Sequence, residues 1–526
     1  MSHELRPTTC AWLSAALLLL ASCGGEESTG PANVLLISVD TLRADHLHCY
    51  GYERETSPAI DRLAAEGVLC ERAYSTTSWT LPAHHSMLSG LFVSGHGVCD
   101  ERLWQVVGIP EGPSEHPQRG ASLAEVLEAD GYDTAGFFTW KYLEERFGFG
   151  AGFDTWERVA RPIYEDPDYA QLLASGDTQR LEELRAEHPE RFDMQLPTAH
   201  LAVDRALDYL DEERAAPFFL FVHLFDVHDD YLPPPPFDER FDPAYNGPLD
   251  GSRITSADSP MQPGMNPRDL EHLIALYDGE IAWVDSQLQR LLDGLEQRGL
   301  AEDTLVVLTS DHGEEFFEHG HKTHRTHLFR ESVEVPLVFR FPGRLPAGQR
   351  VAGPTGIVDI APTVARLLGV DPPAGLSGSD LSPILRGEQS NEERAYLSEL
   401  FIFPDGEWSP ELQLGVHKGD KHWILSAPPG QPARAVVFER SGDALEEGFG
   451  TPLALDDPEL AGELERLRAL VAAQRRRAPA RGGDVRPLSA AEIAELADLG
   501  YSGLSESGEA ELGEAAELCM DGCIWP

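Results

Sequence analysis

The chain has 526 residues, with 41 lysines and arginines against 89 aspartates and glutamates, and its formal net charge is −48. A surface this acidic repels nucleic acid and other extended polyanions, so we expect no nucleic-acid partner, although a small anion can bind in a locally positive pocket. The hydrophobic fraction of 42% supports a core large enough for one large domain and a smaller one.

The N-terminus has the pattern of an export signal. Arg6 precedes an apolar run over 11–20, which is too short for a stable membrane anchor. The run leads into Leu-Ala-Ser-Cys, ending at Cys23, which resembles a bacterial lipobox. We therefore predict a lipoprotein signal over 1–23, a tether over 24–32, and an exported protein anchored in the bacterial cell envelope through a lipid on Cys23. The alternative is an ordinary cleaved signal with an incidental cysteine.

Apolar runs of strand length alternate with amphipathic segments over the next part of the chain. Strands are predicted at 33–39, 132–139, 218–224, 304–309 and 335–341, and helices at 57–67, 122–130, 201–214, 267–298 and 358–368. Such alternation is typical of an α/β fold with a doubly wound, mainly parallel sheet, which we assign to a catalytic domain over 33–389. The Pro- and Gly-rich stretch 231–266 is predicted to be a surface loop beside the substrate.

The pattern changes near residue 390. Short alternating segments at 396–403, 413–417, 422–426 and 435–439 indicate antiparallel strands, and a helix is predicted to follow from Asp457. We expect a smaller α+β subdomain over 390–480 and a final helix and tail over 481–526. Cys519 and Cys523 are spaced for a small disulfide in an oxidising compartment, whereas the connectivity of the other cysteines stays open.

Four polar residues follow or begin predicted elements in a way that indicates a metal site. Asp40 ends the first strand, Asp311 and His312 end the fourth, and Thr80 begins a turn and short helix that stops at Gly90. Since parallel strands end at the same edge of a sheet, we expect these side chains to converge. Thr80 alone would be interpreted as a helix N-cap. Beside a metal ion, its hydroxyl would have a lowered pKa and become a nucleophile.

Residues 33 to about 368 resemble the sulfatase family, within the alkaline phosphatase superfamily. The resemblance rests on the segments 33–45, 57–64, 277–285, 309–314 and 328–339. It implies an ester hydrolase that acts on a small anionic substrate with one divalent metal ion. Asp40, Asp311 and His312 fall on metal-ligand positions, and Thr80 falls on the nucleophile, itself a metal ligand.

The resemblance also implies a set of substrate contacts. His228 falls on a histidine that contacts the ester group, and His324 falls on an anion contact that is also a candidate acid for the leaving oxygen. Lys141 lies near a family Lys/His pair, and His84 replaces an arginine of the site. His319, His321 and His327 surround His324; a second metal there is an alternative, but we interpret them as exposed polar loop residues.

The chain departs from the family at the nucleophile. The sulfatase signature begins with Cys or Ser, which becomes formylglycine, whereas Thr80 is not expected to be converted, so no formylglycine is predicted. The second aspartate of the family's metal pair is Thr41. Ca²⁺ is common in sulfatases, but the imidazole of His312 favours Mn²⁺ or Zn²⁺.

These departures leave three hypotheses. The first is a hydrolase of sulfate or phosphate-type esters in which Thr80 is the metal-bound nucleophile. The second is a phospho-group transferase of the same superfamily that passes the group from Thr80 to an alcohol. The third is a catalytically silent envelope binding protein, which the joint presence of Asp40, Asp311, His312, His228 and His324 disfavours.

Overall fold

The computed structural model describes residues 32–99, 121–160, 172, 178–187, 196–256, 258–373, 375–402, 411–427, 432–440, 450–454, 457–462 and 465. The predicted signal, all but residue 32 of the tether, the C-terminal helix and tail, and the Cys519–Cys523 pair lie outside these residues. Within the described ranges, no helix combines the length and the apolar composition that crossing a membrane requires. Cys99 is disulfide-bonded, whereas Cys49 and Cys70 are free thiols.

The central element is an eight-stranded sheet in the order β12-β2-β11-β7-β1-β6-β4-β5. Its strands are β1 (Asn33–Val39), β2 (Val68–Cys70), β4 (Asp133–Phe138), β5 (Thr155–Arg158), β6 (Phe218–Leu224), β7 (Thr304–Ser310), β11 (Leu337–Arg340) and β12 (Gln349–Val351). Neighbours pair in parallel except β11, which is antiparallel to β7 and to β2. The predicted doubly wound, mainly parallel sheet is therefore confirmed.

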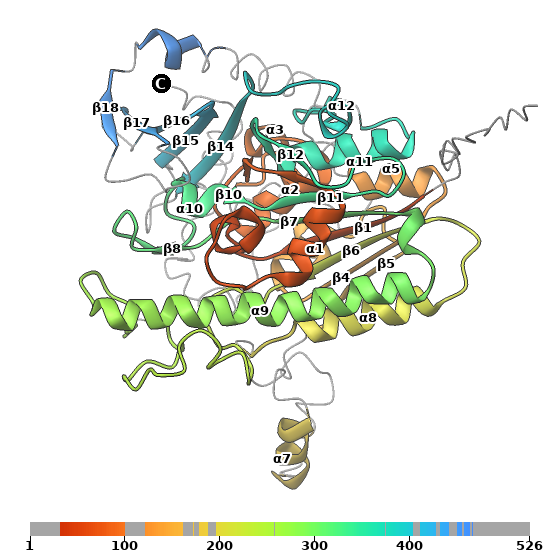
Figure 1. Cartoon of the computed structure of the whole chain (residues 1–526), viewed down its shortest axis with the longest axis horizontal. Helices are drawn as coiled ribbons and strands as arrows, with labels where there is room; N and C mark the ends of the chain where they lie inside the picture. Colours follow the sequence, from red (N-terminus) through yellow and green to blue (C-terminus); the bar gives the residue numbers. More distant parts are fainter. Residues whose placement is uncertain are drawn as a thin grey trace, which may run out of the picture.

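Helices cover both faces of this sheet. The helices of the described residues are α1 (Pro58–Glu66), α2 (Thr80–Ser89), α3 (Val93–His96), α5 (Leu123–Ala129), α7 (Thr178–Glu187), which projects away from the sheet in Figure 1, α8 (Ala199–Asp211), α9 (Pro267–Gln297), α10 (Arg330–Val333), α11 (Ile360–Leu368) and α12 (Ser382–Leu385). Short 3-10 turns are η1 (Ala44–His46), η2 (His48–Tyr50), η3 (Lys141–Leu143), η4 (Glu145–Phe147), η7 (Ala301–Asp303) and η8 (Ile357–Asp359). Figure 1 shows α8 and α9 on one side of the sheet and α2, α5 and α11 on the other.

The alternation of side chains along β1 explains this layering. Val34 and Leu36 pack into the core shared with α2, α5 and α11, whereas Leu35 and Ile37 pack into the core shared with α1, α8 and α9. All four side chains are fully buried. A strand that is covered on both faces needs a continuous apolar run, and β1 has one.

A second sheet, antiparallel and five-stranded, forms the C-terminal part in the order β14-β15-β16-β17-β18. Its strands are β14 (Ala395–Ile402), β15 (Glu411–Lys418), β16 (Lys421–Ala427), β17 (Arg434–Glu439) and β18 (Thr451–Leu453). β14 is hydrogen-bonded to the segment that precedes α2: the Glu399 N–H donates to the Thr76 carbonyl (2.7 Å), and the Ser398 hydroxyl donates to the Ser75 carbonyl (2.7 Å). The Ser94 N–H donates to the Glu399 carboxylate (2.8 Å).

The structure corrects two local expectations. The turn predicted at Thr80 is already the first turn of α2, because Pro82 occupies a position whose N–H has no acceptor within the helix. The strand predicted over 335–341 is broken at Pro336 into β10 (Glu334–Val335), which pairs with β3 (Ala73–Tyr74), and β11. β3 also pairs with β13 (Thr355–Gly356), and a hairpin of β8 (Glu315–Phe316) and β9 (Lys322–Thr323) follows the end of β7.

Candidate active site

The predicted metal ligands meet at one edge of the large sheet. Val39 and Ser310 are register partners on the adjacent parallel strands β1 and β7, so the residues that follow them, Asp40 and Asp311, lie side by side. Ligand atoms of Asp40, Asp311 and His312 all lie within 4.8 Å of one another, and all three side chains are 0% exposed. Nε2 of His312 is 3.6 Å from Oδ1 of Asp40 and 3.5 Å from Oδ2 of Asp311.

The donor atoms of this cluster suit a divalent cation. Both carboxylate oxygens of Asp40 and Oδ2 of Asp311 are buried without a hydrogen-bond partner. Burial raises the pKa of Asp40, and burial together with the neighbouring Asp40 raises the pKa of Asp311 to about 7. Two adjacent buried carboxylates are costly unless a positive charge compensates them. The residues present therefore fit the metal ion that the family requires.

His312 is held in the tautomer that a metal ligand needs. Its Nδ1 lies 2.9 Å from the carbonyl oxygen of Gly313 and donates to it, so the lone pair is on Nε2, which faces the carboxylates. Burial and the nearby His324 lower the pKa of His312 to about 3, so the ring is neutral. Oδ1 of Asp311 accepts the backbone N–H groups of His312 (2.9 Å) and Thr41 (3.3 Å), which directs the other oxygen inward.

Thr80 lies next to this cluster, as predicted. Its Oγ1 is 3.4 Å from Nε2 of His312. Trp79 is the N-cap of α2 and Thr80 is its first residue, 3% exposed, so the hydroxyl stands at the positive end of the helix dipole. The helix ends at Gly90, whose φ of 69° gives the left-handed C-cap expected from the sequence.

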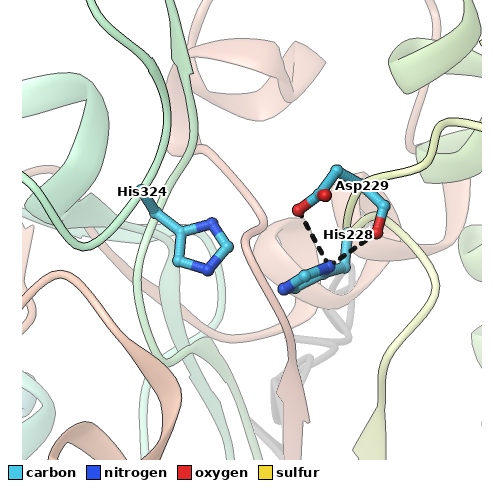
Figure 2. Close-up of side chains that lie close together, drawn as sticks. All are labelled: His228, Asp229 and His324. Atoms are coloured by element: carbon cyan, nitrogen blue, oxygen red, sulfur yellow. Dashed lines mark hydrogen bonds and ion pairs between the residues drawn. The ribbon is translucent and has the colours of Figure 1, made fainter. Parts of the chain in front are cut away.

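His228 and His324 lie close together (Figure 2), next to His312 of the cluster. Their ring centroids are 4.8 Å apart, and the His324 centroid is 4.6 Å from that of His312. Burial lowers the pKa of His228, but the carboxylates of Asp229 and Asp40 outweigh it and raise the pKa to about 9. Burial and the charge of His228 lower the pKa of His324 to about 3.

Lys141 begins η3 directly after β4 and is buried. Its Nζ lies 5.8 Å from the ring centroid of Trp140, which stacks on Phe225 at 4.2 Å. The Trp140 ring is in turn 6.1 Å from that of His228. Lys141 therefore lies near the ring of Trp140, which in turn lies near His228.

His84 lies one helical turn after Thr80 and is fully buried. Nδ1 donates to the Thr80 carbonyl (2.9 Å), and Nε2 accepts the hydroxyl of Ser38 (3.0 Å). Burial lowers the pKa of His84 to about 4, so the ring is neutral. Because both nitrogens are engaged within the protein, this geometry favours a positioning role for His84 over a substrate contact.

Three residues of the site were not singled out as site residues from the sequence. His223 is the one polar side chain of β6; its Nε2 is 3.3 Å from Oδ2 of Asp40, and neither ring nitrogen has a hydrogen-bond partner. Asp229 follows His228 directly, and Glu314 is 0% exposed and contacts Nδ1 of His324 at 3.3 Å. A histidine inside an apolar strand that ends at the ligand edge was the available signal for His223.

The other histidines of the His324 loop pack among themselves and against the protein. The rings of His321 and His327 stack at 3.7 Å, and the ring of His319 stacks on Phe329 at 3.9 Å. Nδ1 of His319 is 2.6 Å from the Glu331 carboxylate. His321 is exposed and His327 is half-buried, but His319 is 2% exposed, so the interpretation as exposed loop residues is wrong for His319, which packs into the protein.

The model of the family described as Sulfatase matches residues 32–370. The chain belongs to the sulfatase family. The family is metal-dependent, and the chain is a sulfatase-like ester hydrolase.

Individual relatives agree with this assignment. The chain is 26% identical over 477 residues to steryl-sulfatase of Mus musculus, a match that covers 74% of this chain and 72% of the relative. It is also 26% identical over 428 residues to the multifunctional alkaline phosphatase superfamily protein PehA of Trinickia caryophylli, covering 71% and 80%. Among solved structures, the phosphonate monoester hydrolase of Agrobacterium radiobacter has a TM-score of 0.63 at 23% identity, covering 84% of this chain and 96% of that one, which shows a shared fold.

Proposed function

We propose that the protein hydrolyses a small sulfate or phosphate-type ester with Thr80 as an unmodified nucleophile, while Asp40, Asp311 and His312 hold one divalent cation. The observation that carries the proposal is the 3.4 Å approach of the Thr80 hydroxyl to Nε2 of His312, beside three buried carboxylate oxygens without hydrogen-bond partners. The nitrogen ligand favours Mn²⁺ or Zn²⁺ over Ca²⁺.

The chain's own residues account for the steps of the reaction. The Thr80 hydroxyl loses its proton to solvent, its Oγ1 attacks the sulfur or phosphorus atom, and the bond to the leaving oxygen breaks as that oxygen takes a proton from the imidazolium of His228, whose pKa is raised to about 9. His324, the acid expected from the sequence, has a pKa lowered to about 3 and is neutral. Water then attacks the ester formed on Thr80 and releases the inorganic anion. His228 pairs with the anionic group, and His84 holds the first turn of α2 in place. A bound cation would lower the pKa of the Thr80 hydroxyl and neutralise charge in the transition state.

Both ester classes remain in the proposal because the relatives divide between them. Steryl-sulfatase is named for a sulfate ester, whereas the phosphonate monoester hydrolase is named for a phosphorus ester. An unmodified threonine favours the phosphorus esters, since formylglycine-dependent sulfate hydrolysis needs a convertible Cys or Ser.

A substrate comparison with matched variants tests the proposal. Aryl sulfate, phosphate monoester and phosphodiester turnover would be measured for the wild type, Thr80→Ala and Thr77→Ala, a control that removes another buried threonine hydroxyl of the same segment. We expect Thr80→Ala to lower kcat at least about a thousandfold and Thr77→Ala to retain most activity. If Thr80→Ala leaves turnover unchanged, Thr80 is not the nucleophile. If the wild type transfers the group to an added alcohol in preference to water, the protein is a transferase.

We also propose that the protein is exported and lipid-anchored at Cys23, on the sequence pattern alone. Expression in a bacterial host with labelled palmitate and detergent phase partition tests this. Label on the wild type and its loss from Cys23→Ala would support an anchor, whereas an unlabelled wild type would leave only an ordinary cleaved signal.

A further inference from the structure

We infer a second cation site formed by His228, Asp229 and His324, next to the cluster of Asp40, Asp311 and His312. The inference extends the proposed function and rests on it, because it assumes that Asp40, Asp311 and His312 hold a first cation. It changes the role of the two histidines, which become ligands of a cation instead of direct contacts of the ester.

The geometry of the three side chains suits a metal ion. One ligand atom from each lies within 4.8 Å of those of the other two. Figure 2 shows the His324 ring directed toward the space beside His228 and Asp229. Asp229 is 3% exposed, and its Oδ1 is buried without a hydrogen-bond partner, although it lies 3.2 Å from Nδ1 of His228. A buried carboxylate oxygen without a donor is the group that a cation satisfies.

Hydrogen bonds orient both imidazoles for this role. Nδ1 of His228 donates to the carbonyl oxygen of Asp229 (2.9 Å). Nδ1 of His324 donates a hydrogen bond to Oε1 of Glu314 (3.3 Å). The neutral form of each ring, which is the form that binds a metal, therefore has its lone pair on Nε2. Histidine ligands of metals are commonly held in this way, with the second nitrogen donating to a carbonyl or a carboxylate.

Buried carboxylate oxygens around the pair also indicate a second ion. Asp40, Asp311, Asp229 and Glu314 are all at least 97% buried, and each has at least one oxygen without a hydrogen-bond partner. An ion held by Asp40, Asp311 and His312 leaves those oxygens of Asp229 and Glu314 without a partner.

The two cationic residues on either side of His324 have partners elsewhere. Lys322 donates to the carbonyl oxygens of Ile254 (2.7 Å) and Met261 (2.9 Å) and to the hydroxyl of Ser259 (2.7 Å). The Arg325 guanidinium carbon lies 4.1 Å from the ring centroid of Trp79.

Two imidazole nitrogens and one carboxylate oxygen are a donor set that suits Zn²⁺ in a site with an open fourth position. The two clusters adjoin through His312 and His324, whose ring centroids are 4.6 Å apart. Paired metal sites act on ester hydrolysis by binding the attacking and the leaving oxygen separately. The second cation would thus bind the leaving oxygen.

The test is a Zn²⁺ titration of the chelator-treated full chain, with bound zinc measured by elemental analysis after gel filtration. The variants are His324→Ala and Asp229→Asn for the second site and Asp311→Asn for the first. His327→Ala is the matched control, because it removes a histidine of the same loop that lies outside the cluster. Circular dichroism of each variant shows whether it is folded, and Co²⁺ absorption spectra give a second readout of ligand loss.

We expect His324→Ala and Asp229→Asn each to bind one equivalent of zinc less than the wild type, with altered Co²⁺ bands, and His327→Ala to match the wild type. Unchanged stoichiometry and Co²⁺ bands in both variants would overturn the second site. If the stoichiometry of those two variants is unchanged but Asp311→Asn binds one equivalent of zinc less than the wild type, the first site and the proposed function stand. The two histidines then contact the ester directly.

Discussion

Nε2 of His84 lies 3.0 Å from the hydroxyl oxygen of Ser38, and this contact ties α2 to β1 across 46 positions of sequence. Nδ1 of the same ring donates to the carbonyl of Thr80 at 2.9 Å. One buried imidazole thus holds the nucleophile's own helical turn against the strand that ends at Asp40. The distance between the nucleophile and the metal ligands depends on this ring.

Replacing His84 by alanine should reduce both stability and activity. The substitution leaves the Ser38 hydroxyl and the Thr80 carbonyl without their buried partner, which costs about 1–3 kcal/mol each. Urea denaturation should show a lower free energy of unfolding, and kcat should fall while KM changes less. His48→Ala is the control, because His48 is exposed, and should change stability by less than about 0.5 kcal/mol. Equal effects of the two variants on stability and kcat would contradict the role of His84 in joining α2 to β1.

His84 and His223 should each make an acid-sensitive contribution to the stability of the metal-free protein between about pH 6.5 and pH 4. Burial lowers the pKa of both rings to about 4, from 6.5 in the ordinary state. In that window these two rings bind protons in the unfolded chain but not in the folded chain, so their contribution rises with pH and is lost as the pH falls; the raised pKa of Asp311 contributes with the opposite sign. Each histidine contributes a slope of about 1.4 kcal/mol per pH unit. Urea midpoints across this range measure it, and His84→Gln should have the shallower slope.

Removal of bound metal should lower the melting temperature. Asp40 and Asp311 have buried oxygens without hydrogen-bond partners, so a cation that binds only the folded chain stabilises it, by about 2.7 kcal/mol at a concentration of a hundred times its Kd. Differential scanning calorimetry with and without EDTA measures the difference. Asp311→Asn should melt near the EDTA-treated wild type and respond little to added Mn²⁺. Asp293→Asn, which changes a more exposed carboxylate, should keep the full metal response.

Lys322→Met should loosen the segment around 254–261. The ammonium group of Lys322 joins that segment to the loop that carries His324, through Ile254, Ser259 and Met261. We expect faster proteolysis near this segment and a higher KM, with a smaller change in melting temperature. Lys421→Met removes a lysine from the C-terminal sheet and should leave both quantities unchanged. A protease pattern identical to that of the wild type would show that the contact does not hold the segment.

The elements that could be predicted from the sequence are those whose pattern is local. β1, β6 and β7 are long apolar runs, and the rule that parallel strands end at one edge is sufficient to place Asp40 beside Asp311. β2 and β12 have only three residues each, and their pairing depends on the rest of the sheet, so periodicity could not reveal them.

Within the site, too, local sequence patterns predict some residues and miss those that depend on long-range contacts. Asp229 and His324 are 95 positions apart in numbering, and their meeting depends on the loops after β6 and β7, which no local pattern describes. His223 enters the site because Ser38 and His223 are register partners in β1 and β6. Register between strands that are distant in sequence is a property of the folded sheet, so the histidine could be interpreted only as part of an apolar strand.

The boundary predicted at residue 390 separates two sequence patterns that share one core. Leu397 and Leu400 of β14 belong to the same buried cluster as Leu81 and Met87 of α2, and the segment before α2 bonds to β14 through Thr76 and Glu399. A chain shortened at 389 would therefore expose the apolar face behind its own nucleophile. A shortened enzyme made from this protein must therefore retain this shared apolar face as well as the catalytic residues. The same holds for a chimera that takes its C-terminal sheet from a relative.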